Sequence, residues 1–167
     1  GVTEAGYTEL YNTGDRFPGG QVSWKRMGAT PDVHVEVTPE SGKSTQVVGM
    51  VVRGVDTTTA FDVTTTTTTG GSGGPNPPSI TPVTDDCLIV AIGLIDDDDI
   101  AEANITQPSG YTNFVAQEGS PNAAGTAMMS SKILATAAAE DPAGYSAIGM
   151  SDPWHAVTIA LRPDAGG

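Results

Sequence analysis

The chain has 167 residues, the usual size of one domain, which is enough to bury an ordinary core without metals or disulfides. Charged residues make up only 16%, and the abundance of Gly, Pro, Thr, Val and Ala favours strands and turns over helices. The formal net charge of -13 argues against a nucleic-acid partner, because phosphate binding needs a clustered Lys/Arg surface.

The charge is unevenly spread along the chain. Five of the seven basic residues precede residue 60, so the remainder carries nearly all the negative excess; these five are Arg16, Lys25, Arg26, Lys43 and Arg53. Such acidity serves solubility or docking onto a basic patch. No apolar segment reaches the roughly 18 residues of a membrane span and no signal peptide is visible, so we expect no membrane partner.

The chain up to residue 69 contains five segments with strand character. Gly6-Tyr-Thr-Glu-Leu-Tyr11 leads through a turn rich in Gly, Pro and Asn to a predicted strand over 21–27. Alternation in His34-Val-Glu-Val-Thr38 predicts a strand with one inward and one outward face. The nearly continuous apolar run within 46–53 predicts an interior strand, and the threonine run 64–69 has good strand propensity.

A Gly/Pro-rich segment, 70–78, separates the halves and has the composition of a flexible linker. A half of about 60 to 80 residues with so few large apolar groups would have a marginal core. We therefore expect one sandwich domain over 1–163, with 70–78 as an exposed loop and 164–167 as a flexible tail.

The second half begins with the apolar run 87–95, in which Cys87, the only cysteine, is expected to be buried as a small hydrophobe. Gly110-Tyr-Thr-Asn-Phe-Val115 then repeats the pattern of 6–11, and predicted strands follow over 126–134 and 154–162. The stretch before Pro142 is too short for a helix.

This self-similarity predicts two pseudo-repeats, about 1–62 and 79–163. Gly and Pro recur every 8 to 15 residues or so, as in sandwiches and jelly rolls rather than βαβ units. We predict an all-β, two-sheet antiparallel sandwich with a jelly-roll-like arrangement. The first half lacks an equivalent of 87–95, so we expect that strand either upstream of Gly1 or donated by a neighbouring subunit.

Three short motifs carry a resemblance to a known group: Pro108-Ser-Gly-Tyr-Thr112, Val52-Arg-Gly-Val-Asp56 and Ala160-Leu-Arg-Pro163. They resemble the Pro-Pro-Ala-Gly-Trp/Tyr-Thr, Tyr-Arg-Gly-Val-Asp and Ala-Leu-Arg-Pro elements of a β-sandwich domain common in phage structural proteins and in bacterial secreted or surface proteins. The resemblance covers nearly the whole chain. It implies a virion decoration, head-fibre or tail-associated module without catalytic residues. The missing strand and the low-charge composition rich in Gly and Thr lead us to expect that the protein forms a homo-oligomer and attaches to a phage capsid or tail protein. The expected location is the virion or the extracellular space.

Enzyme-like patterns in the chain are weak. Ser72 lies in a G-x-S-x-G sequence, typical of the nucleophile elbow of α/β-hydrolases, but three prolines follow where the helix should begin. His34 and His155, the only histidines, are expected on separate strands rather than beside Ser72. We therefore expect no catalytic site and no enzyme activity.

One acidic loop is the candidate site for a metal ion. The carboxylates of 96–99, with Glu102 and the nearby Asp85 and Asp86, could ligate calcium, although they do not follow the spacing of an EF-hand. A run of adjacent carboxylates is more often a solvated loop or a contact for a basic partner. We expect no cofactor, with calcium as the alternative.

The aromatic residues define the second functional hypothesis, an extracellular adhesin or carbohydrate-binding module that stacks sugars on exposed rings. The residues are Tyr7, Tyr11, Trp24, Tyr111, Phe114 and Trp154. Aromatics make up only 5% of the chain, so we expect the core to need most of them. Arg53 and Arg162 end equivalent predicted strands, and each is expected to pair with a carboxylate or cap a turn.

Overall fold

The computed structural model describes residues 5–14, 16–38, 45–97, 100–119, 125–147 and 149–165. Strands β1 (Thr8–Asn12) and β2 (Gln21–Trp24) form one antiparallel sheet. A second antiparallel sheet has the order β3-β7-β4-β6-β5. Its strands are β3 (Thr66–Gly70), β4 (Cys87–Ile95), β5 (Thr112–Gln117), β6 (Thr126–Leu134) and β7 (Trp154–Leu161). The predicted class, an all-β two-sheet antiparallel sandwich, is confirmed.

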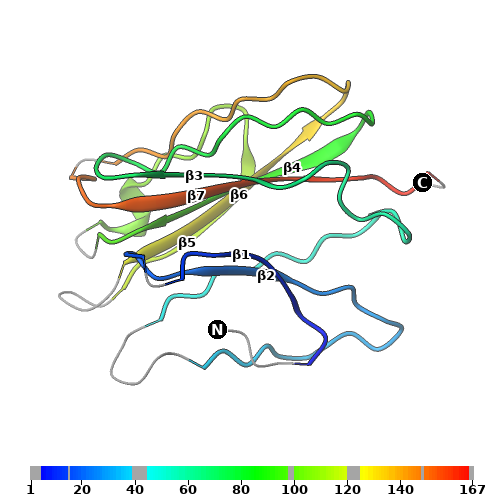
Figure 1. Ribbon diagram of the computed structural model, residues 1–167, viewed down its shortest axis with the longest axis horizontal. Helices are drawn as coiled ribbons and strands as arrows, with labels where there is room; N and C mark the ends of the chain where they lie inside the picture. Colours follow the sequence, from blue (N-terminus) through cyan, green and yellow to red (C-terminus); the bar gives the residue numbers. More distant parts are fainter. Residues whose placement is uncertain are drawn as a thin grey trace.

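The five-stranded sheet is the middle layer of the molecule (Figure 1). One face of it buries Ile89 and Ala91 under non-strand segments that contribute Ile80, Ile105 and Tyr145. These segments are the green and orange traces above the sheet, and η1 (Glu102–Asn104) is a single 3-10 turn among them. The other face packs against β1 and β2. Because both of its faces are covered, β4 is apolar throughout.

The opposite face has its own apolar cluster. Its buried members are Val90, Ile92, Val157 and Ile159, and side chains from β1, β2 and the chain before β3 pack on them. Tyr11 of β1 also reaches β7, where its hydroxyl lies 2.7 Å from Nδ1 of His155. The first and second halves of the chain therefore share one core.

The repeated Gly-Tyr-Thr sequence marks two similar hairpins, β1–β2 and β5–β6. Gly6 and Gly110 each have a positive φ, 84° and 80°, which a glycine adopts without strain. Each hairpin also has an irregular register, between Glu9 and Tyr11 in β1 and between Thr112 and Val115 in β5. A bulge of this kind changes the direction of the strand and its side chains.

Two strand predictions are wrong: neither 34–38 nor 46–53 forms a strand of either sheet. The apolar run within 46–53 suits an interior strand, but both sides of β4 are already paired, with β6 and β7. Strand formation depends on a partner ladder, which the local sequence cannot supply. The pseudo-repeats therefore correspond in their hairpins and differ in their last strand.

The segment 71–78 is a loop, as predicted for 70–78, but only part of it is exposed. Pro75 and Pro77 are fully buried, and the carbonyl of Pro75 accepts a 2.9 Å hydrogen bond from the amide of Tyr145. Thr158 Oγ1 donates to the carbonyl of Pro78 over 2.7 Å. Prolines suit this position because they cover the apolar sheet face without adding an amide that needs a partner.

The predicted tail is tied down at its first residue, since the amide of Asp164 donates to the carbonyl of Gly54 over 2.8 Å. The expected upstream strand and residues 166–167 lie outside the described residues. No helix in the described part of the chain is both long and apolar enough to cross a membrane.

Candidate functional site

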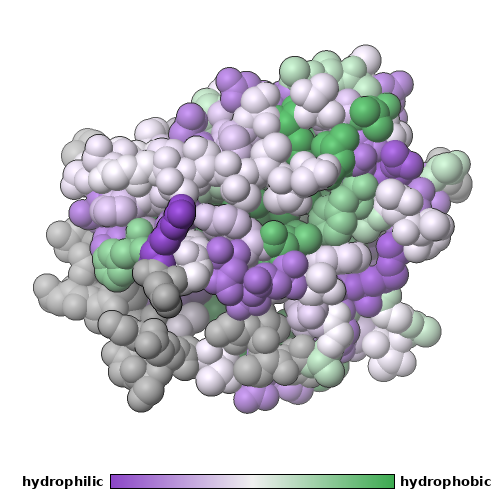
Figure 2. Space-filling model, viewed as in Figure 1, coloured by the Kyte–Doolittle hydropathy of each residue, from purple (hydrophilic) through white to green (hydrophobic). Residues whose placement is uncertain are grey.

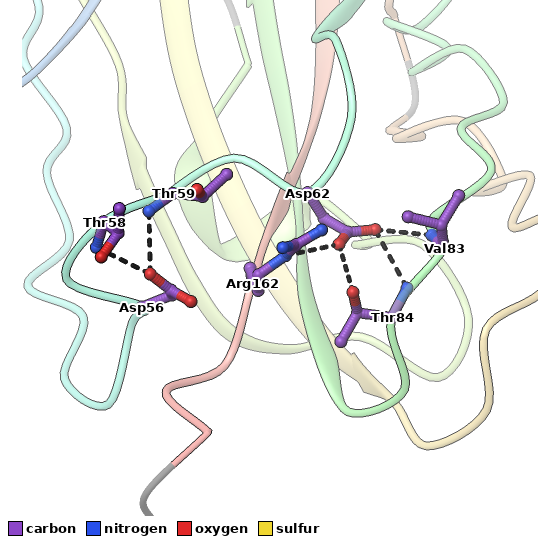
Figure 3. Close-up of polar contacts among 7 residues, drawn as sticks. All are labelled: Asp56, Thr58, Thr59, Asp62, Val83, Thr84 and Arg162. Atoms are coloured by element: carbon purple, nitrogen blue, oxygen red, sulfur yellow. Dashed lines mark hydrogen bonds and ion pairs between the residues drawn. The ribbon is translucent and has the colours of Figure 1, made fainter.

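Two of the three motifs pair with each other. Val55 and Pro163 form an isolated antiparallel bridge, and the amide of Asp56 donates to the carbonyl of Arg162 over 2.9 Å. The Asp56 carboxylate accepts from the amides of Thr58 and Thr59, which closes a tight turn (Figure 3). These contacts attach the 52–56 segment to the end of β7, so the motif residues act in the framework of the fold.

A buried carboxylate lies beside this pair. The side chain of Asp62 has no exposed surface and accepts hydrogen bonds from Val83, Thr84 and, at 3.0 Å, Nε of Arg162 (Figure 3). Burial opposes ionisation, but these donors outweigh it and hold the pKa of Asp62 below its ordinary value. We call Asp62, Thr84 and Arg162 the latch. The expected pairing of Arg162 is confirmed.

The one cysteine is buried beside the latch. Cys87 has no exposed surface. Burial, and then the neighbouring Asp62 carboxylate, raises the pKa of the thiol to about 11. Because the thiolate is the reactive form, this thiol is inert at neutral pH.

The third motif is also structural. Tyr111 is 3% exposed and its hydroxyl donates to Oε1 of Glu140 over 3.3 Å. Lys132 pairs with the same carboxylate at 2.9 Å and lies over the Tyr111 ring. Burial, followed by the Glu140 charge, raises the pKa of Tyr111. The motif thereby joins the start of β5 to β6 and to the segment after it.

Ser72 and His155 have hydrogen-bond partners other than each other. The carbonyl of Ser72 accepts a 2.9 Å hydrogen bond from Nε1 of Trp154, which holds the loop against β7. His155 is bonded to Tyr11, and burial lowers the pKa of its imidazole. His34 is exposed, in a segment outside both sheets.

The acidic loop is only partly described, because Asp98 and Asp99 lie outside the described residues. Asp97 is 4% exposed, and its carbonyl accepts a hydrogen bond from Thr126 Oγ1. Within the ranges that the structure describes, no three His, Cys, Asp or Glu side chains are grouped to hold a metal ion.

The six aromatic residues considered for sugar stacking are buried or half-buried. Trp154 is 9% exposed, and Trp24 packs edge-on against Phe61 with ring centroids 4.8 Å apart. Phe17, which no sequence pattern singled out, is instead the aromatic side chain with a largely open surface, at 66%.

One open feature of the surface is the outer edge of β5. This strand pairs with β6 on one side, and within the described residues its main chain forms no other backbone hydrogen bond. A groove of about 500 Å³ lies next to this edge, between 49–53 and the face of the sheet, where Phe114 and Val115 of β5, Ser131 of β6 and Leu88 of β4 line it. Val51 and Val115 are 73% and 37% exposed there. The main chain of 45–53 forms no backbone hydrogen bond in the described structure either. We call this region the β5 edge.

Apolar surface is not confined to the β5 edge. Figure 2 shows hydrophobic residues gathered at the upper right of one face, over the region where β4 begins, with polar residues around them. Val83, just before β4, is 69% exposed. An isolated exposed valine needs no partner, whereas a groove next to the free side of an edge strand offers a partner both apolar contact and hydrogen bonds.

The chain matches no protein-family model, and neither the curated proteins nor the solved structures include a significant match to it.

Proposed function

We propose that the protein is a non-catalytic structural component of a virion, a capsid decoration or a fibre- or tail-associated protein that self-assembles and ornaments or stabilises the particle. The observation that carries this proposal is the β5 edge, where the outer side of an edge strand lies next to an apolar groove and offers a site of attachment to the particle. Such an edge is a template for pairing with another chain.

The motif contacts support the same proposal. The three motifs that resemble phage structural domains all make framework contacts, at the latch end of β7 and at the start of β5. These contacts stabilise the sandwich, which suits a protein that binds a particle through one fixed surface. Glycan binding has less support, because the candidate aromatic residues are buried or half-buried.

The first test is the mass of the purified chain in solution, measured by light scattering, followed by electron microscopy of the native particle with the labelled protein. We expect a homo-oligomer, and label at regular positions on the capsid, fibre or tail. A monomer that leaves the particle unlabelled and binds an immobilised glycan would overturn the proposal in favour of an adhesin. Repeating the mass measurement with calcium tests the acidic loop separately.

A further inference from the structure

We propose that the β5 edge receives an extended segment of a partner protein in which apolar and basic side chains alternate. The inference rests on the proposed structural function and deepens it by naming the chemistry of the partner. It is carried by two depressions, one on each face of the sheet, that both include residues of the edge strand β5.

The first depression is the apolar groove already described, on the face of the sheet that packs against β1 and β2. Val115 lines it and pairs with Met129, which belongs to the apolar cluster on that face. The other wall is 49–53, where Val51 is largely exposed. Apart from Arg53, the lining side chains of this wall are apolar.

The second depression lies on the opposite face. It encloses about 530 Å³ and is lined by 101–103, Ile105, Phe114 and Glu118. Ile105 belongs to the cluster on that face, whereas Val115 in the first depression pairs with Met129 of the other cluster, so the two depressions lie on either side of the sheet; Phe114 lines both. Glu102 and Glu118 are both exposed and give this depression a negative charge.

A strand added to β5 would place its side chains alternately on the two faces. Side chains that point to one face would lie on the same side of the sheet as the apolar groove, next to Val115, and those that point to the other face would meet Glu102 and Glu118. Apolar residues fit the first position, and Lys or Arg the second. Main-chain hydrogen bonds to the β5 edge would supply affinity, and the two depressions would supply specificity.

A second copy of this chain fits less well. The net charge of -13 disfavours pairing of two copies through this edge, whereas it attracts a basic segment. Self-assembly of the protein would then use a different surface, and the β5 edge would remain available to the particle.

The test uses the full chain, isotopically labelled for NMR, and a soluble peptide of about seven residues in which Lys and Val alternate, close to the length of an ordinary strand. Two matched peptides replace Lys by Glu or Val by Ser. We expect the Lys-Val peptide to shift the amide signals of 112–117, and each matched peptide to bind about tenfold more weakly or worse.

Two variants locate the interaction. In Glu102→Lys/Glu118→Lys the preference should reverse toward the Glu-Val peptide, because the charge of the second depression is reversed. Val83→Lys, which changes an exposed valine elsewhere, should leave binding unchanged. The proposal is overturned if the Lys-Val peptide leaves the signals of 112–117 in place, or if the Glu-Val peptide binds the native protein equally well.

The outcome also separates this inference from the proposed function. An oligomer that forms through β5, and is lost in Val115→Lys, would show that the second copy is the occupant; the partner chemistry would then be wrong and the structural role would stand. If the Lys-Val peptide leaves the β5 amide signals unshifted but the protein still labels the particle, only the proposed chemistry of the partner segment would be overturned. A protein that neither assembles nor labels the particle would overturn the structural role itself.

Discussion

The latch and the β5 edge differ in how the polar groups at the periphery of one sheet are satisfied. At the latch, Asp62 has donors at both carboxylate oxygens, and loop segments satisfy the end of β7. At the β5 edge the outer main-chain groups have no backbone partner in the described structure. Satisfied groups hold a fold together, whereas unpaired groups beside apolar surface are available to another chain. Changes at the latch should therefore cost stability, and changes at the β5 edge should cost binding.

The largest loss of stability is expected on substitution of Asp62. Asp62→Ala removes the acceptor of four hydrogen bonds and leaves Arg162 without its carboxylate, so we expect a loss of about 3 kcal/mol in the free energy of unfolding. Urea denaturation measures it. Asp141→Ala, at an exposed carboxylate, is the control and should leave the midpoint in place. Equal midpoints for both variants would mean that the latch is not a stabilising element.

A smaller loss of stability is expected on substitution of Tyr145 in the core. The hydroxyl of Tyr145 donates to the carbonyl of Ala91 and contacts Ser130 Oγ, both at 2.8 Å. Tyr145→Phe should cost about 1.5 kcal/mol, because it leaves two buried polar groups without this partner. The same denaturation assay measures it, and Tyr7→Phe, at a half-buried ring, is the control. A fully neutral Tyr145→Phe would contradict the hydrogen-bond assignment.

The contact between Tyr11 of β1 and His155 of β7 predicts that the stability of the fold depends on pH. Burial lowers the pKa of His155 below its ordinary value of 6.5, so the unfolded chain binds a proton more readily than the folded one. Stability should be level above about pH 7.5 and fall as the pH drops through 6.5 toward the folded pKa. Thermal unfolding between about pH 5.5 and 7.5 measures this slope. His155→Gln should flatten it, whereas His34→Gln should keep it; the reverse pattern would refute the assignment.

The smallest effect on stability is expected at the β5 edge. Val115→Thr keeps the β-branched shape at a side chain that is 37% exposed, and should change the free energy of unfolding by no more than about 0.5 kcal/mol. The same substitution at Val157, which is fully buried, should cost about 2 kcal/mol. Comparable losses at the two sites would mean that Val115 is part of the core rather than of an open edge.

Local sequence identified most strands because each carries its own signal. The bounds of β4 and β6 agree with the predicted 87–95 and 126–134, since long apolar or β-branched runs between turns have few other structures available. The threonine run became β3, and the burial of Cys87 followed from its apolar neighbours. The prediction for 46–53 had the same kind of signal and was wrong, because no described strand of this chain pairs with it.

The candidate site was harder to predict than the fold. Its residues, Val51, Phe114 and Val115, are ordinary strand-forming residues with no motif around them. An open edge is defined by which strand lacks a neighbour, and strand order is a property of the whole sheet. The acidic flank, Glu102 and Glu118, is visible as charge in the sequence, but only the folded chain places those charges beside β5.

The sequence by itself determined the all-β class, the two Gly-Tyr-Thr hairpins and the apolar central strand, because glycine geometry and hydrophobic periodicity act over a few residues. Only the tertiary structure decided that Arg162 meets Asp62, 100 positions away, that Pro75 and Pro77 cover the core, and that β5 is an edge. Each of these depends on which distant segments compete for the same sheet face or strand side, and such competition is resolved only in the packed chain.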